Sequence, residues 1–239
     1  MSESIAKKVS LSEFEFVDFG CSAGGSLEKF PRMFKTKKPG LGLDISKEKV
    51  EVTRAAGHRA EICDLTTFRH PEKVRFVGMS HLLEHIPDFN HVKHIIATAC
   101  SLAKEFVYIS QPFFDADGKL FENNLKLYCS HWSGHPNHMT VLEFHNVLQP
   151  MLEKGTLKRF LIVGKKPILD SENKAVHPLT SPINQHAYDA AKHDPKKIMK
   201  FDFLVFRETI ALIDMEGKHM DFLKSRVRAD HIFYDSANS

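Results

Sequence analysis

The sequence is poor in several residue types that mark specialised classes of protein. Its 239 residues include four cysteines, none of them in a C-x-x-C pair, so we expect neither a disulfide framework nor a zinc ribbon. No apolar run approaches the roughly 18 residues that a membrane-spanning helix needs, and the amino-terminal segment M-S-E-S-I-A-K-K has no apolar signal core. These absences predict a protein of the reducing cytoplasm that is not inserted in a membrane.

A large excess of charge of one sign is also missing. The sequence has 33 Lys and Arg against 30 Asp and Glu, a formal net charge of +3, which is far from the basic bias of a dedicated nucleic-acid binder. We therefore expect no nucleic-acid partner, and we interpret the lysine cluster in residues 192–200 as a solvated surface. One Trp and four Tyr contrast with 15 His. Histidine carries protons and binds metals, so its distribution bears on function.

Strand-like and helix-like segments alternate through the first half of the chain. The β-rich runs are residues 13–19, 41–45, 59–63, 75–80 and 106–111. Helical patterns separate most of them, at residues 26–35, 46–56 and 91–103. Strands that alternate with helices favour βαβ units and a parallel sheet.

The second half is less regular. The capping-box pattern Thr140-x-x-Glu143 predicts a helix that ends near Lys154. Residues 157–164 and 201–213 are apolar strand candidates, and the polar, proline-containing residues 166–200 between them read as an insertion. The tail after Gly217 is charged, and we expect it to be peripheral.

Glycine and aspartate stand where successive predicted strands end. The first strand runs into a turn that begins at Gly20, the second ends at Asp44, and the third is followed by Asp64. Glycine lets a ligand approach the backbone closely, and an acidic residue about 20 positions further on suits the hydroxyls of a ribose. Because parallel strands end at one edge of their sheet, these residues predict a nucleoside-binding crevice.

These residues resemble a known family. From about Phe14 to Gln111 the chain is similar to the class I S-adenosylmethionine-dependent methyltransferases, in the order and spacing of four strings. The strings are D-F-G-C-S-A-G-G, G-L-G-L-D-I-S, I-C-D-L and M-S-H-L-L-E-H-I-P-D. The resemblance implies an S-adenosylmethionine cofactor and a methyltransferase activity. One departure is Ser22, where the family often has a glycine.

The resemblance also implies roles for individual residues. Asp18 and the turn around it would line the methionine portion of the cofactor, Asp44 and Ile45 the ribose, and Asp64 and Leu65 the adenine. Ser80, His81 and Leu82 would close over the cofactor. The residues of the turn are Gly20, Cys21, Ser22, Ala23 and Gly24.

Two other functions remain open at this point. An NAD-dependent Rossmann oxidoreductase would need G-x-G-x-x-G, whereas the chain offers Gly20-x-Ser22-x-x-Gly25 and so lacks the glycine that lets the backbone approach a pyrophosphate. A non-catalytic module that binds S-adenosylmethionine is the second alternative, because a fold does not by itself give a function.

The segment after the fifth predicted strand is the natural place for the acceptor of the methyl group. It contains the only tryptophan, and His131, His135 and His138 are our candidates for a general base. Their spacing would permit a metal site on a helix, but Gly134 and Pro136 argue against a regular helix, so we name no metal ligand.

The sequence says less about the identity of the acceptor. The chain lacks the N-P-P-Y-type tetrapeptide that marks amino-group methylation in this family, so we favour transfer to oxygen of a small-molecule or glycan-type acceptor. The fold that we predict is a Rossmann-like α/β methyltransferase sandwich with a seven-stranded, mostly parallel sheet. The resemblance to the family implies that the last strand is antiparallel. We expect a single domain over residues 1–239, with a cofactor-binding core at 12–111, an acceptor loop at 112–139 and the insertion at 166–200. The insertion could cover the active site or support a homodimer.

Overall fold

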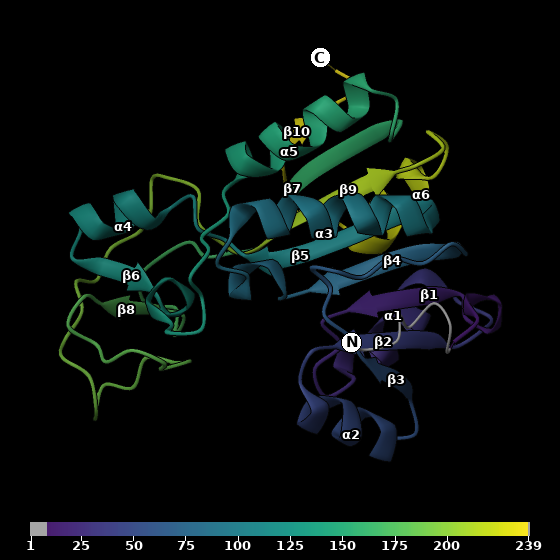
Figure 1. Cartoon of the computed structure of the whole chain (residues 1–239). Coiled ribbons are helices and arrows are strands. Elements are labelled where there is room, and N and C mark those ends of the chain that lie inside the picture. The colour runs from purple at the N-terminus through teal and green to yellow at the C-terminus, as the bar shows by residue number, and fades with distance from the viewer. Residues whose placement is uncertain (1–8, 239) are drawn as a thin grey trace.

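The computed structural model describes residues 9–238, which form an α/β sandwich around one large sheet (Figure 1). Its strand order is β10-β7-β9-β5-β4-β1-β2-β3. The ends of the predicted domain, with the segment that lacks a signal core, lie outside the described residues. The strands are β1 (Phe16–Phe19), β2 (Gly40–Asp44), β3 (Arg59–Ile62), β4 (Val74–Ser80), β5 (Ala103–Pro112), β7 (Arg159–Pro167), β9 (Phe206–Asp214) and β10 (His231–Asp235).

The strand directions confirm a mostly parallel sheet and correct its size. Strands β1 to β5 are parallel to one another, and β9 is antiparallel to both β5 and β7. We predicted seven strands with residues 157–164 and 201–213 at the edge. Instead, β9 lies between β5 and β7, and within residues 9–238 an eighth strand, β10, forms the edge by antiparallel pairing with β7.

The carboxyl-terminal tail is part of this core, so the prediction that it is peripheral was wrong. Helix α6 (Met220–Val227) buries Met220, Leu223 and Val227, whose spacing places them on one helical face. The polar residues between them hid this pattern in the sequence. Strand β10 follows α6 and completes the sheet.

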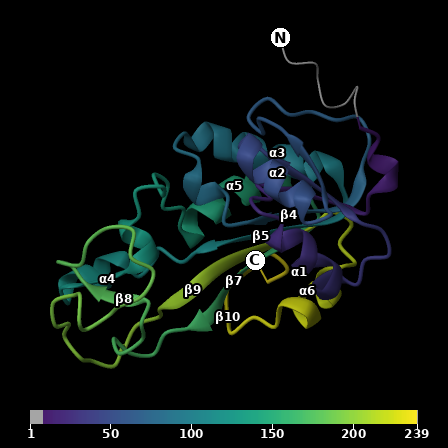
Figure 2. The same cartoon turned by 90° about the horizontal axis from the view of Figure 1, so that it is seen from below.

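Helices cover both faces of the sheet, as Figure 2 shows for α3 and α5 on one side and α1 and α6 on the other. Alternate residues of β5 serve the two layers: Val107 and Ile109 pack with α3 and α5, whereas Phe106 and Tyr108 pack with α1 and α6. The other helices are α1 (Gly25–Phe34), α2 (Lys47–Ala55), α3 (Phe89–Leu102), α4 (Asp117–Glu122) and α5 (Val141–Glu153). No helix among residues 9–238 has both the length and the apolar character needed to cross a bilayer.

Side-chain caps begin two of the predicted helices, whereas the helix predicted from residue 91 begins at Phe89. The Ser46 hydroxyl accepts a hydrogen bond from the Lys49 backbone N–H at 3.3 Å and so caps α2. At the start of α5, Thr140 and Glu143 form a capping box, in which each side chain accepts from the other's backbone N–H.

The acceptor segment and the insertion form a smaller unit beyond one end of the sheet (Figure 1). Strand β6 (Leu125–Leu127) comes from the first and β8 (Val176–Pro178) from the second, and the two pair antiparallel around a separate apolar cluster. The predicted strand at 201–213 begins only at Phe206, because residues 201–205 continue the insertion. Lys196 is buried against two carbonyls rather than solvated, contrary to our interpretation of the lysine cluster.

Ion pairs of Asp235 connect the last strand, β10, to β7 and α6. The Asp235 carboxylate accepts two hydrogen bonds from Arg159, at 2.8 and 3.0 Å, and one from Lys224 at 3.0 Å. These bonds hold the pKa of Asp235 well below its usual range. A carboxyl group of depressed pKa stabilises the fold above the unfolded-state pKa of about 4, and this contribution is lost as the pH falls further.

We therefore expect Asp235→Asn to lower the free energy of unfolding at pH 7 by about 3 kcal/mol, since it leaves Arg159 without its carboxylate. Urea unfolding measures this, with the exposed Asp202→Asn as control. The difference between wild type and Asp235→Asn should shrink below about pH 4. An equal loss in both variants, or a difference that does not depend on pH, would contradict this account of the tail.

Candidate functional site

The turn between β1 and α1 has a backbone that few residues can adopt. Gly20 has φ +73° and Gly24 has φ +90°, both in the left-handed region that favours glycine. A Cβ on Gly20 would also lie 2.7 Å from the Leu82 side chain. Ser22 shares this region at φ +48°, and its backbone is fixed by N–H donation to Asp44 at 2.9 Å and by a hydrogen bond from Thr53 to its carbonyl at 2.6 Å.

Asp18, at the end of β1, is fully buried, and neither of its carboxylate oxygens has a hydrogen-bond partner among the described residues. Burial, with repulsion from Asp44, raises the pKa of Asp18 well above its usual range, while Lys29 acts in the opposite direction. A buried carboxylate without a partner is costly. The protein therefore keeps an acceptor for a cation or a donor directly beneath the glycine-rich turn.

Asp44 ties the turn to the next βα unit. One carboxylate oxygen accepts from the Ser22 N–H and the other from the Ser46 N–H, each at 2.9 Å. Asp64 is fixed more locally, because the hydroxyl and the N–H of Thr66 donate to it at 2.7 and 2.9 Å and lower its pKa. Both carboxylates are thus held in place by these donors.

A cavity of about 110 Å³ opens at this edge of the sheet. It brings together six of the predicted cofactor residues: Gly20, Asp44, Ile45, Asp64, Leu65 and Leu82. It is also lined by residues that we did not predict: Cys63, Thr66, Ile86 and Ile95. Cys63 and Ile86 lie within the quoted strings and Thr66 directly follows one, so the sequence could have indicated them. Ile95 comes from the middle of α3 and carried no signal.

The other predicted cofactor residues are not among those that line the cavity. Cys21 packs under the turn, where burial raises the pKa of its thiol to about 12. Ala23 is exposed, and Gly24 lies against Thr53 and His58. The Ser80 hydroxyl lies 3.2 Å from that of Ser110. The His81 ring forms a hydrogen bond with Glu84 at 3.1 Å.

The three predicted base candidates line one hollow of about 540 Å³ in the acceptor segment, together with Trp132 and Ile183. His131 accepts a hydrogen bond at Nδ1 from Lys126 at 2.6 Å, and partial burial and this cation lower its pKa. His138 stacks on Phe114 with ring centroids 4.3 Å apart.

His135 reaches from this hollow to the segment that follows β4. Its Nδ1 donates to the Cys129 carbonyl at 2.9 Å, and burial lowers its pKa. The ring of His85 lies 4.9 Å from that of His135, and His85 Nδ1 donates to the Gly134 carbonyl at 2.6 Å. Sequence reasoning did not assign His85 to this region, although the excess of histidine pointed to such a grouping.

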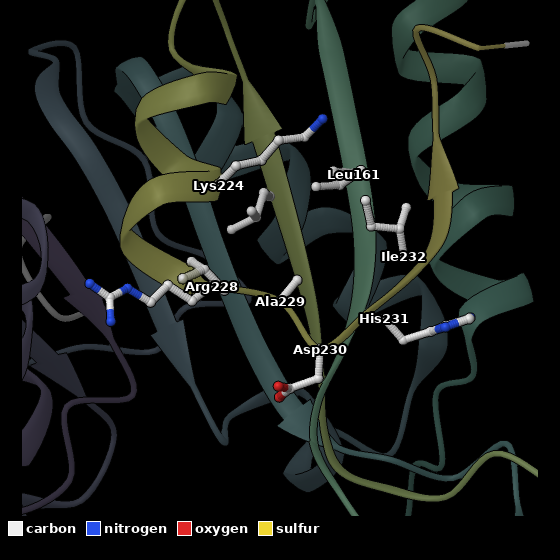
Figure 3. Close-up of a pocket in the computed structure, with 9 residues that line it drawn as sticks. Leu161, Lys224, Arg228, Ala229, Asp230, His231 and Ile232 are labelled. Carbon is white, nitrogen blue, oxygen red and sulfur yellow. The ribbon is translucent and has the colours of Figure 1, made fainter.

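A further hollow of about 510 Å³ lies between α6, β7 and β10, at the sheet edge opposite β3 (Figure 3). Figure 3 shows Leu161 from β7 facing residues that extend from Lys224 to Ile232. None of the predicted site residues lines it. The candidate site is therefore the crevice at the carboxyl ends of β1, β2 and β4.

Comparisons with known proteins bear on the fold. Neither the protein-family models nor the characterised proteins gave a match to the sequence. Among solved structures, an S-adenosylmethionine-dependent methyltransferase of Archaeoglobus fulgidus is similar with a TM-score of 0.58 and 11% identity, over 85% of this chain and 86% of that one. Magnesium protoporphyrin IX methyltransferase of Synechocystis, with bound S-adenosylhomocysteine, is similar with a TM-score of 0.50 and 12% identity, over 89% of this chain and 78% of that one.

A third structure, an S-adenosylmethionine-dependent methyltransferase of Methanosarcina mazei, gives a TM-score of 0.50 and 14% identity over 90% of this chain and 98% of that one. These likenesses show that the chain has the Rossmann-like α/β fold of S-adenosylmethionine-dependent methyltransferases, as the sequence predicted. What the fold is used for has to be argued from the residues of the crevice.

The conformation of the turn gives a direct prediction. Gly20→Ala should lower the free energy of unfolding by about 1–2 kcal/mol, because a Cβ at positive φ is strained and Leu82 leaves it little room. Gly118→Ala is the matched control, since Gly118 lies in α4 with open space around it and alanine favours a helix. Urea unfolding that found Gly20→Ala as stable as Gly118→Ala would contradict the described turn.

Proposed function

We propose that the protein is an S-adenosylmethionine-dependent methyltransferase that methylates an oxygen of a small-molecule or glycan-type acceptor in the cytoplasm. The observation that carries the proposal is Asp18, a buried carboxylate without a hydrogen-bond partner among the described residues, which stands two positions before Gly20 of the cavity lining. S-adenosylmethionine, when bound, supplies a methyl group on a positively charged sulfur.

The residues of the crevice fit the parts of this cofactor. Asp18 would hold the ammonium group of the methionine portion, which supplies the donors that the carboxylate lacks. The turn from Gly20 to Gly24 would lie along the same portion, where the absence of a Cβ at Gly20 leaves room for close approach. Asp44 and Ile45 would hold the ribose.

The remaining contacts follow from the cavity and its rim. Asp64 and Leu65 would hold the adenine, and Ser80, His81 and Leu82 would close over the cofactor. Leu82 and Leu65 line the cavity from different strand ends, so apolar surface faces a planar ring from two sides. The protein would chiefly align the two reactants, because methyl transfer needs the acceptor atom in line with the sulfur–methyl bond that breaks.

The hydrogen bonds of the hollow separate the three candidate bases. His131 accepts from Lys126 at Nδ1, so its neutral ring carries the proton on Nε2 and has no free lone pair. His135 has the opposite tautomer, since its Nδ1 donates to a carbonyl. His138 Nδ1 lies 3.6 Å from a carboxylate oxygen of Asp117, which can orient the ring. These contacts favour His135 and His138 over His131 for taking a proton from an acceptor hydroxyl.

Binding tests the proposal. Calorimetry should show one-to-one binding of S-adenosylmethionine to the wild-type protein and none of NAD. Asp18→Asn should weaken the binding by about 10- to 100-fold, the range for one lost hydrogen bond to a charged group. The same variant should stabilise the cofactor-free protein, more at pH 7 than at pH 4, because the raised pKa of Asp18 makes its ionisation unfavourable to folding.

Asp202→Asn is the control, because Asp202 is exposed. Tight binding of NAD in place of S-adenosylmethionine would establish the oxidoreductase alternative and overturn the proposal. Binding of S-adenosylmethionine with no methyl transfer to any hydroxylated acceptor would favour the non-catalytic module. The predicted homodimer stays a prediction.

A further inference from the structure

Three side chains from separate parts of the chain converge between the cofactor cavity and the acceptor hollow. Glu84 and His85 belong to the short 3-10 helix Leu83–His85 after β4, and His135 belongs to the acceptor segment. One ligand atom of each lies within 4.8 Å of those of the other two. Two imidazoles and a carboxylate are a common set of ligands for divalent transition metals.

The hydrogen bonds of both histidines prepare them for this role. His85 Nδ1 lies 2.6 Å from the Gly134 carbonyl, and His135 Nδ1 lies 2.9 Å from the Cys129 carbonyl. A carbonyl can only accept, so each Nδ1 carries the proton and each Nε2 keeps its lone pair. Histidines that ligate metals are held in this manner, with the second ring nitrogen bonded to a carbonyl or carboxylate.

The carboxylate supplies an independent observation. Glu84 is 1% exposed, and its Oε2 has no hydrogen-bond partner among the described residues. Its other oxygen is bonded to His81 at 3.1 Å. Buried charges are normally paired or bound to a metal. A purely structural role for Glu84 would leave half of its carboxylate unsatisfied, whereas an ion beside Oε2 would satisfy it.

We propose that Glu84, His85 and His135 bind one divalent transition-metal ion, such as Zn²⁺, Mn²⁺ or Fe²⁺. Bonds of about 2.1 Å let two ligand atoms stand up to about 4.2 Å apart, so small side-chain rotations close the observed separation. Three protein ligands leave at least one coordination position for another molecule. This proposal replaces our expectation that the chain has no metal ligand, which considered only the spacing of His131, His135 and His138.

The position of the cluster indicates a role for the metal ion in methyl transfer, an inference that rests on the proposed function. Leu82 and Ile86, which flank the short helix, line the cofactor cavity, and His135 lines the acceptor hollow. A hydroxyl bound to a metal ion has a lowered pKa and releases its proton more readily. The ion would therefore hold and activate the acceptor hydroxyl, with His135 as a ligand and His138 as the group that receives the proton.

Metal binding can be measured without any acceptor or cofactor. We expect the wild-type chain, stripped with a chelator, to bind one equivalent of Co²⁺ with visible absorption bands and one of Zn²⁺ by calorimetry. Glu84→Gln, His85→Ala and His135→Ala should each weaken Zn²⁺ binding by about 100-fold, because even outer hydrogen-bond partners of a metal site are worth about 10- to 100-fold. Thermal melting checks that the variants are folded.

His186→Ala is the matched control, since His186 packs on Trp132, which lines the hollow, but lies outside the cluster. It should bind Zn²⁺ as the wild type does. No one-to-one binding by the wild type, or wild-type affinity in His85→Ala and His135→Ala, would overturn the proposal. If Glu84→Gln does not fold, His85→Ala and His135→Ala still test the metal site, because His85 is exposed and His135 is only partly buried.

Failure of this proposal and failure of the proposed function give different results. Binding of S-adenosylmethionine in the presence of a chelator, with no metal binding, would reject the metal site alone. Metal binding without affinity for S-adenosylmethionine would reject the methyltransferase function and leave the metal site in place.

Discussion

The carboxylate of Asp18 is the point on which the crevice depends. It lies at the end of a central parallel strand, fully buried and without a donor among the described residues, so the folded chain bears a cost there. Within residues 9–238 no donor bonds to this carboxylate, and the neighbouring carboxylate of Asp44 repels its negative charge. Under the proposed function, the ammonium group of the cofactor would relieve this cost, and the stability of the core would then depend on whether the crevice is occupied.

The second half of the molecule adds a second hollow to this arrangement. Strands β6 and β8 join the acceptor segment to the insertion, and the Lys126 ammonium strengthens the junction by donating to the carbonyls of Leu179 and Ser181. His131 is bonded to the same ammonium, so it belongs to the framework of the unit. The hollow lined by His135 and His138 is thus built from both segments and faces the short helix after β4.

Much of the fold could be predicted because its signals are local. Helix and strand boundaries are marked by residues with particular backbone preferences. The structure has Gly20 in the turn after β1, and Ser46 and Thr140 as helix caps. The errors fell where tertiary contacts override composition. The charged tail became α6 and β10 because its apolar residues share one face, and Lys196 became buried because two carbonyls receive it.

In the candidate site, too, the residues that could be predicted are those marked by local signals. Asp44, Asp64 and Leu82 follow strand ends, and a parallel sheet gathers such positions at one edge. Ile95 and the partnership of His85 with His135 depend on how α3 and the acceptor segment pack, and no short-range pattern encodes that. Sequence spacing pointed instead to His131, His135 and His138 as a group, of which the structure ties His131 to Lys126.

A crystal structure of the chain with S-adenosylhomocysteine tests the central claim most directly. The account predicts that the ligand's ammonium group lies within hydrogen-bond distance of Asp18, its ribose against Asp44 and its adenine beside Asp64 and Leu65. The account would be contradicted by a ligand bound elsewhere, such as the hollow between α6 and β10, or by an Asp18 carboxylate that still has no partner when the crevice is occupied.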